Sequence, residues 1–135
     1  MNTIIFTIPH DPPRVTAQQR EVTVVNGRPR FYAPERLRFA QNTYLNDVWP
    51  YRPKTPLSGP VALWVTFNFS TKDKKKWNKA KVTRPDTDNM VKALKDVMTA
   101  AGFWNDDSQV YHEVISKYWS AEGSIRVVIR EMNET

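Results

Sequence analysis

The sequence predicts a single α+β domain, in which a mixed or antiparallel sheet of about four to five strands carries two packed helices. The chain has 135 residues, the size of one domain. Apolar residues recur at spacings of three and four in two segments, and they alternate or run together in several shorter ones. These segments follow the order strand, hairpin, helix, strand, helix, strand, strand, without an internal repeat. We therefore treat residues 1–135 as one domain.

The first half of the chain supplies a strand, a hairpin and a helix. Thr3–Pro9 is rich in β-forming residues and is closed by further prolines. Within Glu21–Pro34, two extended runs flank Asn26 and Gly27, which suit a type I′ turn because both positions tolerate positive φ. From Pro34 to about Trp49 the apolar spacing is helical, and proline suits the first helical position.

The second half supplies the central strand, the second helix and two final strands. Val61–Ser70 alternates and predicts a central strand. A helix is predicted from roughly Asp88 to Ala101, ended by Gly102, with Met90, Val91, Leu94, Val97, Met98 and Ala101 on its core face. Gln109–Ser120 and Ser124–Met132 predict the last two strands.

Charge and composition narrow the function. A net charge of +6 and a pI near 9.7 favour a polyanionic partner, first nucleic acid and second an acidic membrane surface. The absence of cysteine excludes disulfides, zinc-thiolate sites and cysteine nucleophiles. Two histidines are too few for a histidine metal centre, and four glycines form no phosphate loop, so no nucleotide cofactor is expected. The N-terminal apolar run is too short for a signal peptide or membrane span, so we expect a cytoplasmic protein.

The most basic stretch is Lys72–Arg84, with seven Lys or Arg residues and one acid, Asp73. Its polarity predicts a mobile loop over residues 71–85 that contacts the phosphate backbone of DNA. The predicted DNA-binding residues are Lys72, Lys74, Lys75, Lys76, Lys79, Lys81 and Arg84, together with Arg14 upstream. Trp77 suits either stacking on an unpaired base or anchoring the loop on the protein, and the sequence leaves both open.

Four carboxylates follow the basic stretch: Asp86, Asp88, Asp106 and Asp107. An extended backbone entering the helix points Asp86 and Asp88 the same way. Helix capping explains Asp88 alone, and an exposed Asp88–Lys92 salt bridge would contribute well under about 1 kcal/mol. The helix rises about 20 Å and an extended 102–107 segment spans a similar length, so Asp107 is able to reach the helix start.

Three carboxylates that converge on one point repel each other unless a cation joins them. Mg²⁺ prefers such all-oxygen sites and usually keeps waters and a phosphate oxygen as further ligands, with Mn²⁺ as a substitute. Lys92 beside these acids would stabilise negative charge on a reacting phosphate. The basic loop would then bring DNA to a site whose acids otherwise repel it.

At these residues the sequence resembles the RusA family of Holliday junction resolvases of bacteria and their prophages. The resemblance rests on "RPDTDNMVKALKDVM" followed by "AGFWNDDSQV", and the N-terminal half matches more loosely. It implies that Asp86, Asp88 and Asp107 are catalytic metal ligands, and that Lys92 and Asn89 match the family's lysine and asparagine. It also implies a homodimer that binds four-way DNA junctions, with one active site per subunit.

Two other classes compete with this interpretation. One is a non-catalytic basic DNA-binding module whose acids form salt bridges with the lysines. The other is a D-x-D glycosyltransferase, which 135 residues without a nucleotide-binding domain do not support. The sequence therefore predicts a Mg²⁺-dependent endonuclease that nicks two opposing strands of a four-way junction, in DNA recombination and repair. Whether Lys92 serves its own subunit's site or the partner's stays open.

Overall fold

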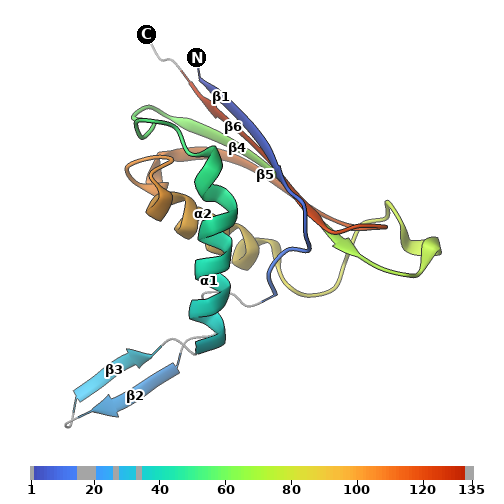
Figure 1. The fold of residues 1–135 in the computed structure, drawn as a ribbon, viewed down its shortest axis with the longest axis horizontal. Helices are drawn as coiled ribbons and strands as arrows, with labels where there is room; N and C mark the ends of the chain where they lie inside the picture. Colours follow the sequence, from blue (N-terminus) through green and yellow to red (C-terminus); the bar gives the residue numbers. More distant parts are fainter. Residues whose placement is uncertain (1, 15–20, 26–27, 33–34, 133–135) are drawn as a thin grey trace.

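The structure, a computed structural model, describes residues 2–14, 21–25, 28–32 and 35–132. Its main body is a four-stranded sheet with α1 (Glu35–Val48) and α2 (Thr87–Ala101) on one face (Figure 1). The strands of this sheet are β1 (Thr3–Ile8), β4 (Val61–Ser70), β5 (Val110–Ser120) and β6 (Ser124–Glu131). The predicted α+β class, with two helices against one mixed sheet, is confirmed.

The sheet has the strand order β1-β6-β4-β5, so β4 lies in the interior as predicted. β6 is antiparallel to both of its neighbours, β1 and β4, whereas β4 and β5 run parallel. Parallel neighbours need a crossover connection. Here the crossover consists of the basic segment and α2, which places the start of α2 near the end of β5.

The core lies between the sheet and the helices. Alternate residues of β4 face the helices, and Leu63, Val65 and Phe67 are at most 1% exposed. The predicted core face of α2 is confirmed, since Met90, Val91, Leu94, Val97, Met98 and Ala101 are all buried. From α1, Tyr44 and Val48 join the same core. The opposite face of α2 therefore remains free for polar side chains.

The predicted N-terminal hairpin is present as two paired strands before α1. β2 (Glu21–Val25) and β3 (Arg28–Tyr32) are antiparallel and form a separate two-stranded sheet. The predicted turn residues Asn26 and Gly27 lie outside the described part of the chain. No helix within the described residues is long and apolar enough to cross a membrane.

The segment after α2 does not run back along the helix, which corrects the expected path of residues 102–107. Gly102 ends α2 with a φ of 88°, and Phe103 and Trp104 are then buried at the same end of the helix. The Leu57 amide donates to the Phe103 carbonyl (2.9 Å), and the Trp104 indole donates to Thr99 Oγ1 (2.7 Å). Two large aromatic side chains bury more area here than an extended return would.

Candidate active site

The N-terminal end of α2 carries two exposed carboxylates that the fold does not use. Asp86 occupies the N-cap position with extended backbone (φ −75°, ψ 149°), but its side chain makes no capping hydrogen bond. Asp88 lies in the first turn, and neither carboxylate belongs to an ion pair between described residues. Helix N-termini favour negative charge, which moderates the repulsion between the two acids. These carboxylates are therefore available to a ligand.

The backbone just before Asp86 is held by two lysines. Lys117 Nζ, from β5, donates to the carbonyls of Thr83 and Pro85, both at 2.8 Å. Lys81 Nζ donates to the carbonyls of Thr83 and Arg84 and to Thr83 Oγ1. The start of α2 is thus fixed to the end of the sheet.

Lys81 differs from its predicted role as a phosphate contact. Its residue is 3% exposed, and its ammonium lies between the rings of Phe69 (5.0 Å) and Trp119 (4.7 Å). Burial, and then the positive charges of Lys117, Arg14 and Lys76, lower the pKa of Lys81. Because the Lys81 ammonium is buried and already donates to protein acceptors, it is not available to a DNA phosphate.

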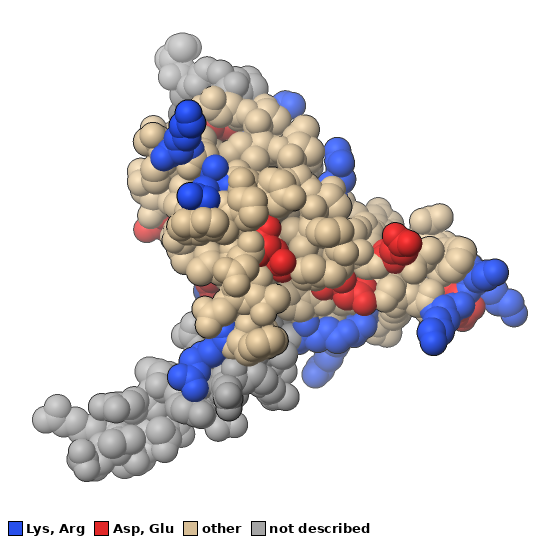
Figure 2. Space-filling model, viewed as in Figure 1, with Lys and Arg blue, Asp and Glu red and all other residues tan. Residues whose placement is uncertain are grey.

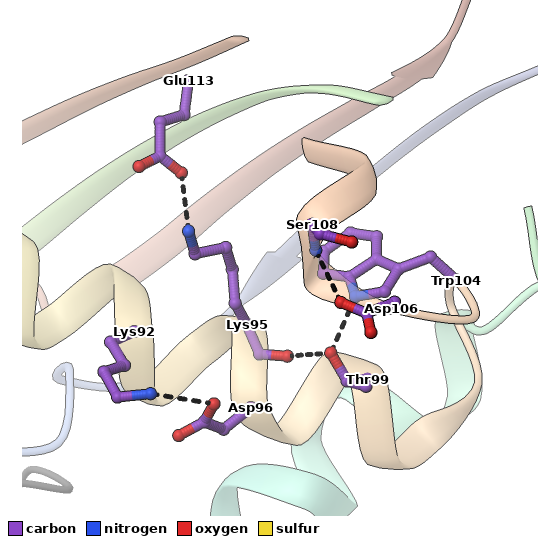
Figure 3. Close-up of polar contacts among 8 residues, drawn as sticks. All are labelled: Lys92, Lys95, Asp96, Thr99, Trp104, Asp106, Ser108 and Glu113. Carbon is purple, nitrogen blue, oxygen red and sulfur yellow. Dashed lines mark hydrogen bonds and ion pairs between the residues drawn. The ribbon is translucent and has the colours of Figure 1, made fainter. Parts of the chain in front are cut away.

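Lys92 lies one turn into α2, on the face away from the core (Figure 3). Its amine is 3.6 Å from Asp96 Oδ1, so its ion pair is with Asp96 and not with Asp88. The Lys92 side chain is 55% exposed, and such pairs contribute little to stability. Lys92 therefore keeps an amine that can turn toward a bound phosphate.

The C-terminal end of α2 carries the other two acids, which behave differently. Asp106 is the N-cap of η3 (Asp107–Gln109), and its carboxylate accepts from the Ser108 amide at 2.8 Å. Gln109 completes a capping box, because its side-chain oxygen accepts from the Asp106 amide at 3.0 Å. The same oxygen also accepts from the Asn105 amide at 2.9 Å. The hydrogen bond from the Ser108 backbone lowers the pKa of Asp106. Asp106, whose role the sequence left open, has a structural function.

The structure brings Asp86 and Asp88 to one end of α2 and Asp107 to the other. A helix of this length rises about 20 Å. Among the described residues of one chain, no three acidic or histidine side chains are grouped closely enough to hold a metal ion. Within a single subunit, Asp86 and Asp88 can hold a cation with waters as its other ligands, and Asp107 is not part of that group.

The basic segment, predicted as a mobile loop, is anchored to the end of β5. The amides of Asn78 and Trp119 donate to the carbonyls of Trp119 and Lys79 respectively, and Ala80 forms a bridge with Tyr118. The Trp77 indole donates to the Thr71 carbonyl (2.9 Å), which favours the anchoring role of this residue.

The tip of the segment, η2 (Lys74–Lys76), projects beyond the sheet, and Figure 2 shows basic side chains gathered there. Apart from Lys81, every predicted DNA-binding residue is exposed: Arg14, Lys72, Lys74, Lys75, Lys76, Lys79 and Arg84. Arg14 also lies 5.1 Å from the ring of Phe69 at the end of β4. A phosphate backbone can therefore reach these charges without any rearrangement of the sheet.

Comparison with known proteins identifies the family. Residues 12–130 match the family model described as Endodeoxyribonuclease RusA. The chain belongs to the RusA family. A crossover junction endodeoxyribonuclease of Lactococcus phage r1t is 33% identical over 121 residues, which cover 87% of this chain and 89% of that protein.

Two further relatives span nearly the whole RusA-family chain. The Bacillus subtilis (strain 168) protein YqaN, described as uncharacterized, is 30% identical over 98% of this chain and 99% of its own length. Crossover junction endodeoxyribonuclease RusA of Escherichia coli K12 is 28% identical over 98% of each chain. The resemblance drawn from residues 84–110 is confirmed, and with it the assignment as an endodeoxyribonuclease.

Sequence reasoning missed Lys117 in this RusA-family chain. In β5, Lys117 stands two residues from Ile115 and from Trp119, which are both packed against the core. A lysine on the core-facing side of a strand must reach polar acceptors, because its ammonium is costly to bury unpaired. The place of Lys117 between two core-facing residues of β5 is therefore the sequence signal that could have identified it.

Proposed function

We propose that this RusA-family protein is a Mg²⁺-dependent, structure-selective endonuclease that resolves four-way DNA junctions by paired nicks in opposing strands. Its place would be in DNA recombination and repair in the bacterial cytoplasm, encoded by a host or a prophage. The observation that carries the proposal is Asp86, which occupies a helix N-cap without capping and lies beside the exposed Asp88. The names of the phage and E. coli relatives support the substrate.

Asp86 and Asp88 fit a divalent cation, because both are exposed carboxylates without a structural partner among the described residues. Hard oxygen ligands suit Mg²⁺, or Mn²⁺ in its place. Such an ion, when bound, polarises the phosphate and lowers the pKa of a bound water. The chain's own contribution is to fix two ligands on a rigid helix start.

The exposed lysines serve the same substrate. Lys92 stabilises negative charge that develops on the scissile phosphate, and its Asp96 partner holds it on the outer face of α2 until then. Lys72, Lys74, Lys75, Lys76 and Lys79, with Arg14 and Arg84, bind the phosphate backbone.

We further propose a homodimer in which Asp107 of the partner subunit completes the site of Asp86 and Asp88. The proposal reconciles the family's three carboxylates with a chain that separates them by the length of α2. A two-fold dimer would place two equivalent sites on opposing strands of a junction with the same symmetry.

The first test is to incubate the protein with a labelled synthetic four-way junction, with and without Mg²⁺. Symmetric nicks that require Mg²⁺, and their absence from a linear duplex, are expected. A non-catalytic DNA-binding module would instead bind the junction equally well with and without metal and would leave it intact.

The second test locates Asp107 by mixing two variants that are each inactive as homodimers. If the site spans subunits, a heterodimer of Asp86→Asn and Asp107→Asn chains has one site with all three carboxylates. Its other site lacks both Asp86 and Asp107. Nicked circles should then form from a plasmid-borne junction. The matched control joins a wild-type chain to a chain with both substitutions, which damages both shared sites. Nicking by the control but not by the complementing pair would place all three carboxylates in one chain.

A further inference from the structure

Two ammonium groups converge on the three residues that precede Asp86. The Thr83 carbonyl accepts from both Lys81 and Lys117, and Lys117 also reaches the Pro85 carbonyl. Lys81 takes the Arg84 carbonyl as well. Every carbonyl from Thr83 to Pro85 is therefore turned toward a lysine. We call Lys81 and Lys117 the lysine clamp.

Lys81 is a costly residue to bury at this position. It is 3% exposed and forms no ion pair with a described acid. A buried charge is normally paired, and an apolar side chain between the rings of Phe69 and Trp119 would avoid the desolvation cost. The charge is therefore retained for what it binds, which is the backbone ahead of α2.

The clamp fixes this backbone to the sheet. Lys117 belongs to β5, and the amide of Lys81 donates to the Lys117 carbonyl at 3.0 Å, so both lysines have the same rigid base. Asp86 follows Pro85 directly, and its carbonyl accepts the first helical hydrogen bond of α2, from the Met90 amide. A shift of residues 83–85 would move Asp86 and the first turn together.

We propose that Lys81 and Lys117 are positioning residues, which hold the Thr83–Pro85 backbone so that Asp86 and Asp88 present their carboxylates to a divalent cation in one fixed arrangement. This inference rests on the proposed function of the two acids. It assigns to Lys81 a role distinct from contact with DNA, and it gives Lys117 a role where none was expected.

The test compares full-length Lys81→Met, Lys117→Met and Lys117→Arg proteins with a control, Lys79→Met, which removes an exposed lysine of the same segment. Three quantities are measured: Mn²⁺ affinity by electron paramagnetic resonance, the salt dependence of junction binding without metal, and hydrogen exchange at the Met90 amide. Thermal unfolding establishes that each variant is folded. Lys117→Met gives the answer should Lys81→Met fail to fold.

We expect the clamp variants to bind Mn²⁺ about tenfold more weakly, which is the usual effect of removing a group that orients a metal ligand. Exchange at Met90 should be faster, and the salt slope should be unchanged. Lys117→Arg should restore much of the affinity, because a guanidinium can reach two carbonyls. Lys79→Met should instead lower the salt slope by about 0.9 and leave Mn²⁺ affinity unchanged.

Wild-type Mn²⁺ affinity in folded clamp variants, or a salt slope reduced as in Lys79→Met, would overturn the inference. Failure of the wild-type protein to bind Mn²⁺ would count against the proposed function instead. Hydrogen exchange would then still test whether the lysine clamp holds the backbone. Unchanged protection of the Met90 amide in Lys117→Met would show that residues 83–85 are not held by Lys117.

Discussion

The two ends of α2 carry similar acidic pairs, but their cap-position aspartates, Asp86 and Asp106, are used in opposite ways. At the C-terminal end, Gly102 adopts the left-handed conformation that closes the helix, and Asp106 caps the next turn. At the N-terminal end, Asp86 has the cap position but no capping bond. There the lysine clamp binds the backbone carbonyls that precede the helix. At the C-terminal end, Gly102 and Asp106 thus serve folding and only Asp107 is left to the proposed shared site, whereas at the N-terminal end both acids are left to a ligand.

The largest expected contrast comes from removing one charge at each end. Asp88→Asn should lower the nicking rate at least about 100-fold. Removing a group that only orients a metal ligand commonly lowers activity about 10- to 100-fold, and Asp88 is proposed as a ligand itself. Asp106→Asn should nick at nearly the wild-type rate, since asparagine caps well. Single-turnover cleavage of a labelled junction measures both, with junction binding as the control. Near wild-type cleavage by Asp88→Asn would erase the distinction between the two ends.

The basic segment before the N-terminal end of α2, proposed to bind DNA, gives the next contrast. Replacing Lys74, Lys75 and Lys76 together with methionine should reduce the salt slope of junction binding by about 2.7, from about 0.9 for each contacted phosphate. Fluorescence anisotropy over a salt series measures the slope. An unchanged slope would mean that these lysines form a solvated surface and not a DNA contact.

The free energy of unfolding should depend more on the C-terminal end of α2 than on the N-terminal end, which is the reverse of the order expected for nicking. Gly102→Ala should lower the free energy of unfolding by about 1 kcal/mol, because alanine is strained at a φ of 88°. Asp86→Ala should change it by less than about 0.5 kcal/mol, although a capping aspartate usually contributes about 1 kcal/mol. Urea unfolding measures both variants. A loss in Asp86→Ala as large as that in Gly102→Ala would assign Asp86 a capping role.

The smallest expected effect is the pH dependence of the Asp106 cap. Hydrogen bonds from Ser108 lower the pKa of Asp106 below its ordinary value of 3.8. Its ionised form therefore contributes stability above pH 3.8, and that contribution is lost as the pH falls through the lowered pKa. At neutral pH the free energy of unfolding should be larger for the wild type than for Asp106→Asn. This difference should disappear at acidic pH. A difference independent of pH would mean that the charge of Asp106 adds nothing to its cap.

Local patterns predicted the elements well, whereas long-range pairing decided the site. The helical spacing of Leu94 and Met98 fixed the buried face of α2, and the alternation of Val61–Ser70 marked an interior strand. The sequence showed only that an extended 102–107 segment is long enough for Asp107 to reach the helix start. In the structure, the burial of Phe103 and Trp104 keeps this segment at the other end of α2. The roles of Lys81 and Lys117 depend on the pairing of a loop with β5, which no local pattern contains.

The attachment of residues 78–81 to β5 has a consequence for association between molecules. β5 is an outer strand, and an uncovered outer strand offers free backbone groups on which another chain can assemble as an added strand. The bridge between Ala80 and Tyr118, with the hydrogen bonds on either side of it, occupies those groups over the last part of β5. The basic segment, which we propose to contact DNA, therefore also covers this edge of the sheet. Shortening it should expose backbone groups of β5 to which another chain can pair.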